Sequence, residues 1–213
     1  MNSYSFQKTT NKQKYEEYLE NAIVDFQKYF NIKLKSEPCL IFLKSRQEFN
    51  DVMGCQTFSW VTGYNNSNLI FLMDESIYEA ESSKEYNSQT YILSVKHELL
   101  HQIFRQITGI NRPVWLSEGF SLYFSGQIKF SSRPEKFTDF LLFEEKTNLE
   151  DKSVYRESGF VVELLMNKFG KEKLLELMPL IKSCHNNQEF KKIFKKVYGF
   201  DLNYKNINKF YLP

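Results

Sequence analysis

The spacing of hydrophobic residues in the first quarter of the chain predicts a helix, a strand and a second helix. Apolar side chains recur every three or four residues over 15–30, which is the period of an amphipathic helix with one buried stripe. Pro38 precedes a short apolar run, 39–43, that is typical of a buried strand. Ser45 can then cap a helix and Gly54 can end it, because these residue types satisfy the backbone groups at helix ends.

Two further apolar runs, at 58–61 and 69–73, have the composition of strands. The segment between them, 62–68, is dense in turn-forming Gly, Asn and Ser. We therefore expect a small sheet in this part of the chain. The segment 76–89 is polar and rich in Ser and Glu, and we interpret it as a loop between two lobes.

From residue 90 onward the hydrophobic spacing is almost wholly helical, and glycines stand at several helix ends. The predicted helices cover 90–108, 116–127, 134–143, 153–169, 171–181 and 188–197. The order of elements predicts an α+β fold in a single domain, 1–213. It would comprise a small N-terminal α/β lobe (1–89) with a mixed sheet and a helical C-terminal lobe (90–213), with helix 90–108 between them.

The length and charge of the chain exclude several functional classes. With 213 residues the chain can bury a core without disulfides, and its three cysteines form no Cys-x-x-Cys pair that would indicate a thiolate zinc site. The 28 Lys and Arg against 26 Asp and Glu give a net charge of +2, which is too balanced to indicate nucleic acid or a membrane as partner. The sequence leaves the oligomeric state open, with a monomer favoured.

The N-terminal segment 1–14 is polar and lacks the apolar stretch of a signal peptide. No run approaches the roughly 18 apolar residues of a membrane-spanning helix. As written, the sequence predicts a cytoplasmic protein, and secretion stays an alternative if the chain is a mature or trimmed form. The high content of Lys, Asn, Phe and Tyr fits an AT-rich bacterial coding sequence.

The candidate chemistry lies in the helix predicted over 90–108, which contains His97-Glu98-Leu99-Leu100-His101. Two histidines four residues apart share one helix face, so both imidazoles can reach a single Zn²⁺. Glu98 lies about 100° further round the helix, where it can act as a base without being a ligand. The pattern His-Glu-x-x-His also occurs by chance in unrelated helices, where its two histidines are surface or core residues. The apolar residues around it here favour the zinc site, because buried imidazoles without a ligand are costly.

A catalytic zinc ion needs a third protein ligand, and Glu118 is the best candidate. The turn at 109–113 allows the next helix to return antiparallel and bring Glu118 level with the histidines. Considered alone, Glu118 would be an ordinary glutamate in the first turn of a helix. In combination with His97 and His101 it predicts a metal centre.

These residues resemble the gluzincins, zinc peptidases whose third ligand is a glutamate on a following helix. The sequence from Trp115 to Phe120, Trp-Leu-Ser-Glu-Gly-Phe, is similar to bacterial peptidase MA-like domains and minigluzincins. Strand 39–43, Gly63 before run 69–73 and the stretch 155–160 occur in the usual order, so the resemblance covers most of the chain. It implies a thermolysin-like (zincin) catalytic domain, with 69–73 as our candidate for the edge strand that receives a peptide.

The resemblance further implies a zinc-dependent peptidase acting on a peptide or protein substrate. Zn²⁺ would be held by His97, His101 and Glu118, with Glu98 as general base. Tyr155 is the candidate hydrogen-bond donor to the tetrahedral intermediate, although it is equally explained as a packing residue at a helix start. The glutamate with which gluzincin aminopeptidases grip a substrate's amino terminus has no acidic counterpart after Gly63, which favours an endopeptidase.

Alternative functions stay open. The chain could be a catalytically silent zinc- or peptide-binding module of the same fold, although the intact Glu98 argues against this. It could also be a latent enzyme in which 1–14 covers the site, and hydrolysis of a non-peptide substrate is a further alternative. A Cys184–His185 nucleophile pair is disfavoured, because adjacent residues rarely present their side chains to one another.

Overall fold

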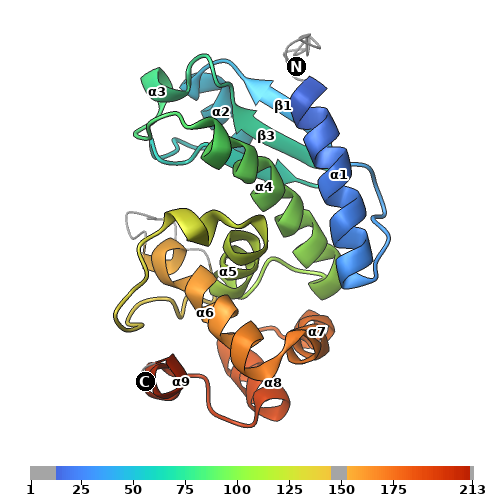
Figure 1. The fold of residues 1–213 in the computed structure, drawn as a ribbon, viewed down its shortest axis with the longest axis vertical. Helices are drawn as coiled ribbons and strands as arrows, with labels where there is room; N and C mark the ends of the chain where they lie inside the picture. The colour runs from blue at the N-terminus through green and yellow to red at the C-terminus, as the bar shows by residue number, and fades with distance from the viewer. Residues whose placement is uncertain (1–12, 145–152, 212–213) are drawn as a thin grey trace. The chain divides into compact units, whose positions relative to one another are not determined.

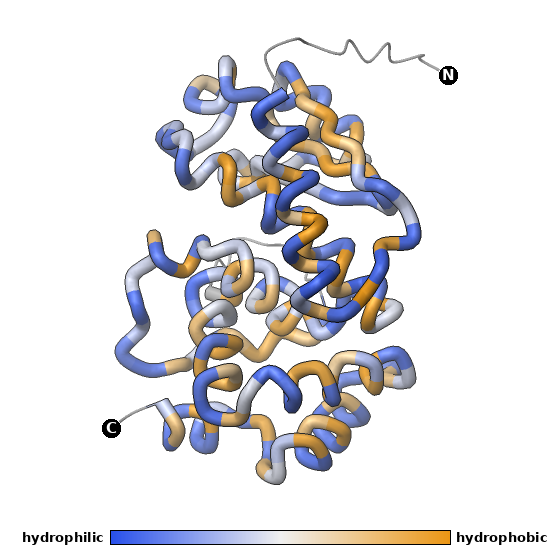
Figure 2. Tube along the Cα trace, turned by 45° about the vertical axis from the view of Figure 1, so that its right-hand side comes forward, coloured by the Kyte–Doolittle hydropathy of each residue, from blue (hydrophilic) through white to orange (hydrophobic). Residues whose placement is uncertain are grey.

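A computed structural model describes residues 13–144 and 153–211, and the expected covering role of segment 1–14 falls largely outside this part (Figure 1). The chain divides into two compact units, Met1–Leu99 and Leu100–Pro213. In both, the helices alternate between hydrophilic and hydrophobic stretches, as amphipathic helices do (Figure 2). Among the described residues, no helix is both long and apolar enough to cross a membrane.

The first unit contains a small sheet and the helices that cover it. In chain order its elements are α1 (Gln13–Phe30), β1 (Cys39–Leu43), α2 (Arg46–Met53), β2 (Gly63–Asn66), β3 (Leu69–Met73), α3 (Tyr78–Glu81) and the first half of α4 (Ser88–Thr108). The expected caps of α2 are confirmed: Ser45 Oγ accepts a hydrogen bond from the backbone N–H of Glu48, and Gly54 adopts a φ of +70°. The α1 stripe is confirmed too, with Tyr15, Leu19, Ala22, Phe26 and Phe30 buried.

The three strands form a mixed sheet in the order β1-β3-β2. β1 runs parallel to β3, and β2 pairs with β3 in the antiparallel sense. The expectation that 69–73 is an edge strand is therefore wrong, since β3 is central. Its buried, almost continuously apolar sequence is what a central strand requires, whereas the polar β2 is suited to an edge.

The expectation of a strand at 58–61 is also wrong. The strand β2 lies instead at Gly63–Asn66, within the segment predicted to be a turn. The carbonyl groups of Phe58 and Val61 instead accept hydrogen bonds from the Arg46 guanidinium. The connection between β2 and β3 therefore has two residues, fewer than the turn predicted over 62–68, and one of them, Ser67, has a φ of +57°. Segment 76–89 lies wholly within the first unit and contains α3, so it is not a loop between lobes.

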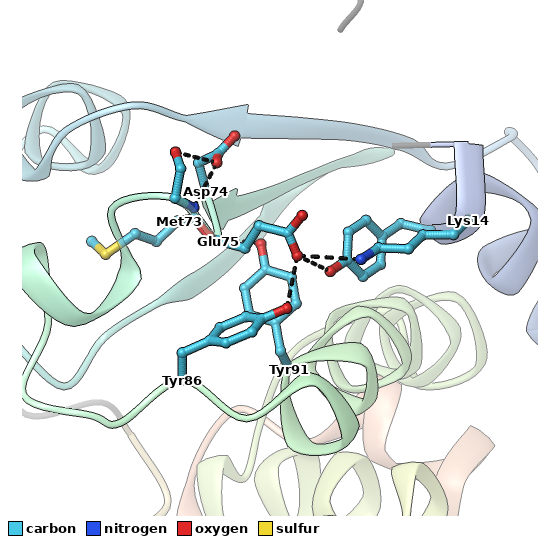
Figure 3. A network of polar contacts seen from close by, with 8 residues as sticks. Lys14, Met73, Asp74, Glu75, Tyr86 and Tyr91 are labelled. Carbon is cyan, nitrogen blue, oxygen red and sulfur yellow. Dashed lines mark hydrogen bonds and ion pairs between the residues drawn. The ribbon is translucent and has the colours of Figure 1, made fainter. Parts of the chain in front are cut away.

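Helices cover both faces of the sheet. α1 and α4 lie side by side on one face, where the rings of Tyr15 and Tyr91 meet at 5.4 Å, and α2 lies against the other face (Figure 1). At the end of β3, Glu75 Oε2 accepts hydrogen bonds from Tyr15 Oη and Tyr86 Oη and contacts Lys14 Nζ at 3.3 Å (Figure 3). This network ties α1 to the segment before α4.

The second unit is helical. After the second half of α4 it contains α5 (Val114–Ser125), the 3₁₀ turn η1 (Gln127–Phe130), α6 (Ser153–Phe169), α7 (Lys171–Leu180), η2 (Ile181–Ser183), α8 (Asn187–Tyr198) and α9 (Tyr204–Tyr211). α5 and α6 pack most closely, because a Cβ at Gly119 would collide with the carbonyl group of Ser158. The helix expected at 153–169 is confirmed, and α9 was not expected.

The helix expected over 134–143 is wrong, since this segment is irregular. The backbone N–H groups of Thr138 and Asp139 donate to the buried carboxylate of Glu157, at 2.9–3.0 Å. Phe137 and Phe140 are buried without helical geometry. The three-residue spacing of these two rings is also the spacing of a helix, which is why a helix was predicted. The backbone is instead satisfied by hydrogen bonds to a residue distant in the sequence.

Candidate metal centre

Helix α4 carries His97, Glu98 and His101 in adjacent turns. The start of the helix is fixed by Asn87, whose side-chain oxygen accepts hydrogen bonds from two backbone N–H groups of the first turn at 2.9 and 3.2 Å. Apolar residues around the motif are fully buried and hold the helix in place, namely Val95, Leu99, Leu100, Ile103 and Phe104. The expected burial of the motif's surroundings is thus confirmed.

His101 is oriented by its neighbour on α5. Its Nδ1 lies 3.0 Å from Ser117 Oγ, and both side chains are buried. If the hydroxyl oxygen accepts from Nδ1–H, the imidazole is in the tautomer whose Nε2 lone pair can bind a metal. The turn that carries Ser117 is anchored by Trp115 and Leu116, which are 1% and 0% exposed.

The three predicted ligands lie together. The ligand atoms of His97, His101 and Glu118 are all within 4.8 Å of one another, and His101 Nε2 is 3.6 Å from Glu118 Oε1. Two ligands at about 2.0–2.1 Å from a tetrahedral ion stand about 3.4 Å apart, so this spacing suits two ligands of one ion better than a direct hydrogen bond. Imidazole nitrogens and a carboxylate oxygen are also donors that zinc accepts. The residues therefore fit a zinc ion, which His97, His101 and Glu118 would hold.

Glu98 is buried and is oriented by β2. Asn65 Nδ2 donates a hydrogen bond to Glu98 Oε2 at 3.0 Å, and a Cβ at Gly63 would stand only 2.5 Å from Glu98 Oε1. Gly63 and Asn65 are two residues apart in β2, so they face the same side of the sheet. The carboxylate thus has a fixed place beside β2, next to His97 in the helix and outside the set of three ligands.

Tyr155 lies in the first turn of α6 and is half-buried. It precedes Ser158 by three residues, so it lies on the side of α6 that packs against Gly119, the residue after Glu118. Tyr155 is therefore one helical turn from the point where α6 meets α5.

The alternative nucleophile is not supported by its surroundings. Cys184 is buried, and this desolvation raises the pKa of its thiol. A raised pKa lowers the fraction of thiolate at neutral pH, which is the reactive form. The neighbouring His185 donates its backbone N–H to Glu189 Oε2 at 2.8 Å, as part of the cap of α8.

The sequence analysis did not predict the contacts that Ser117, Gly63 and Asn65 make with the site. Ser117 directly precedes Glu118, and this adjacency was its one local signal. Gly63 and Asn65 were placed in a turn, because a polar tetrapeptide has no strand signature. Their contacts with Glu98 depend on the pairing of β2 with β3, which local sequence does not encode.

The fold and the site together define a class of protein. A helix-rich α+β chain with a small mixed sheet carries two histidines on one helix and a glutamate on the next, arranged to fit a metal ion. A family model of the Peptidase MA superfamily matches residues 20–210, and the chain belongs to that superfamily. The expected peptidase MA-like family is thereby confirmed. A comparison with curated proteins gives no match.

Proposed function

We propose that the protein is a zinc-dependent peptidase of the gluzincin, minigluzincin-like type, with a thermolysin-like catalytic domain. The observation that supports this most strongly is the convergence of ligand atoms from His97, His101 and Glu118 within 4.8 Å of one another. Membership of the Peptidase MA superfamily, which is generally zinc-dependent, supports the same assignment. Zinc would be held by these three residues.

When bound, zinc would polarise the scissile carbonyl group and lower the pKa of a water molecule towards neutrality. Glu98 would accept the proton from that water and later donate it to the leaving amine. The hydrogen bond from Asn65 supports this role, because it holds the carboxylate in one orientation. The burial of Glu98 keeps bulk water from competing for its carboxylate.

A peptide substrate would bind along β2 by adding a strand to the exposed edge of the sheet. The residues of β2 are Gly63, Tyr64, Asn65 and Asn66, and none carries a charge that could pair with a free amino terminus. This favours an endopeptidase. Tyr155, one turn before the contact of α6 with Gly119, would donate a hydrogen bond to the developing oxyanion, in the role that the family resemblance implies.

The experiment is degradation of a mixed peptide library by the zinc-loaded chain, by the chain after chelation and by Glu98→Gln. Glutamine keeps the size of the side chain but cannot act as a base, so cleavage should fall roughly a hundredfold or more. Retained cleavage in Glu98→Gln would exclude the assigned base. A zinc-loaded chain that cleaves nothing, with or without residues 1–14, would contradict the enzyme assignment and leave a silent module of the same fold.

A further inference from the structure

Two aromatic side chains lie in the loop between α2 and β2. Phe58 is 37% exposed, whereas most large apolar side chains of the described residues are buried. Its ring is nearly parallel to that of Trp60, with an interplanar angle of 11° and centroids 6.3 Å apart. We refer to these two residues as the Phe58–Trp60 pair. Phe58 is exposed and Trp60 is half-buried, and an aromatic side chain held in one place presents apolar surface at a small entropic cost of binding.

The loop that carries the pair is fixed by one half-buried cation, the guanidinium of Arg46. The guanidinium of Arg46 donates hydrogen bonds to the backbone carbonyl groups of Phe58 (3.3 Å), Ser59 (3.0 Å) and Val61 (2.7 Å). It also donates to the carbonyl group of Glu81 on α3, at 2.7 and 3.1 Å. A loop whose carbonyl groups share one guanidinium cannot rearrange without breaking several hydrogen bonds at once. The Phe58–Trp60 pair is therefore preorganised.

The loop leads directly into the strand that orients Glu98. Trp60 precedes Gly63 by three residues, so their Cα atoms are no more than about 11 Å apart. The connection is closed by hydrogen bonds, from Val61 N–H to the Phe58 carbonyl group and from Met73 N–H to the Thr62 carbonyl group, both at 3.0 Å. Gly63 in turn abuts the carboxylate of Glu98. The pair thus directly precedes, along the chain, the strand on which the proposed substrate peptide would extend.

This inference rests on the proposed peptidase function and goes one step beyond it. We propose that the Phe58–Trp60 pair binds an aromatic or bulky aliphatic side chain of the substrate, close to the scissile bond, and so determines cleavage specificity. Flat aromatic faces favour such side chains through stacking and apolar contact.

The first test compares cleavage sites in a peptide library, mapped by mass spectrometry, for the wild type, Phe58→Ala and Trp60→Ala. The wild type should show an enrichment of aromatic or bulky aliphatic residues at one position near the cut. Each variant should lower kcat/KM for peptides with such a residue by roughly three- to tenfold and leave other peptides unaffected. Tyr29→Ala is the matched control, because Tyr29 on α1 is 39% exposed and lies outside this loop. Zinc content should be equal in all four proteins.

The second test measures binding without turnover. Trp60 is one of two tryptophans, and the other, Trp115, is 1% exposed, so ligand-dependent emission reports chiefly on Trp60. In Glu98→Gln, tryptophan-free peptides containing Phe or Leu should change the emission saturably, whereas matched peptides with Asn should not. Adding Trp60→Phe should abolish the signal.

The outcomes of the two tests separate this inference from the proposed function. Cleavage by the wild type with the same site preference in Phe58→Ala and Trp60→Ala would overturn the inference and leave the peptidase intact. Absence of cleavage by the zinc-loaded wild type would overturn the peptidase assignment. The fluorescence titration would then decide the inference, and an emission that no peptide changes would overturn it.

Discussion

Glu98 lies against the backbone of Gly63, so closely that a Cβ on residue 63 would stand 2.5 Å from its Oε1 atom. The absence of a side chain on Gly63 is therefore what allows the carboxylate to occupy its place beside β2. Asn65 completes the contact from the same face of the strand with its hydrogen bond to Oε2. One helix thus supplies the candidate base, and one edge strand fixes its orientation.

Gly63→Ala should displace the Glu98 carboxylate, because the new methyl group cannot share its space. A misplacement of about 1 Å at a reacting group costs on the order of a hundredfold in rate, so kcat for peptide cleavage should fall by about that factor while zinc content stays at the wild-type level. Asn66→Ala is the control, since Asn66 is an exposed residue of the same strand. Full activity in Gly63→Ala would show that the contact is unimportant.

Ser117→Ala should weaken zinc binding without removing a ligand. The variant loses the partner of His101 Nδ1, at 3.0 Å, and such partners typically contribute 10- to 100-fold to metal affinity. Competition with a chromogenic chelator would measure the dissociation constant. Ser117→Thr, which keeps the hydroxyl group, should restore affinity. Ser121→Ala removes another buried hydroxyl from α5 and should leave affinity unchanged, and an equal loss in that variant would argue against a specific role for Ser117.

The network around Glu75 should make stability depend on pH. Burial raises the pKa of this carboxyl group, but hydrogen bonds from Tyr15, Tyr86 and Lys14 outweigh that effect, so its pKa is lowered overall (Figure 3). A carboxyl group whose pKa is lower in the folded state stabilises the protein above its unfolded pKa. This contribution is lost as the pH falls through the folded value.

Glu75→Gln should therefore lower the melting temperature at pH 7 by roughly 2–4 °C, a change typical of losing about 1 kcal/mol in a chain of this size. The difference from the wild type should shrink as the pH is lowered from 5 towards 3. Thermal unfolding followed by circular dichroism across this range would measure it. A difference that is constant with pH would show that the charge of Glu75 is not involved.

Glu157 should be important for stability, because its carboxylate accepts hydrogen bonds from the backbone N–H groups of Thr138 and Asp139. Glu157→Ala leaves these donors unsatisfied near the core, at a cost of about 1–3 kcal/mol each. Denaturant unfolding should show a clear fall in the midpoint. Glu163→Ala, in which an exposed contact with Arg133 is lost from the same helix, is the control and should change little.

The sequence predicted what depends on local pattern. The helix with His97 and His101, the caps of α2 and the bounds of α6 follow from apolar spacing and from capping residues, which act over a few positions. The approach of Glu118 to His101 was also predicted, because a short turn between two helices leaves few ways for the second to return.

What the sequence did not predict depends on contacts between distant residues. β2 is a strand because β3 pairs with it, although its own residues are typical of a turn. The irregular 134–143 segment depends on Glu157, some twenty residues further along the chain. Neither the pairing of β2 with β3 nor the contact with Glu157 can be predicted from neighbouring residues alone. The contact of Asn65 with Glu98 was not predicted for the same reason.

The central claim is that His97, His101 and Glu118 together bind one zinc ion, and metal analysis tests it most directly. The chain purified after zinc loading should contain one zinc per molecule, whereas His101→Ala and Glu118→Ala should each contain far less at the same free zinc concentration and retain wild-type circular dichroism. Equal zinc in the wild type and in both folded variants would contradict the claim.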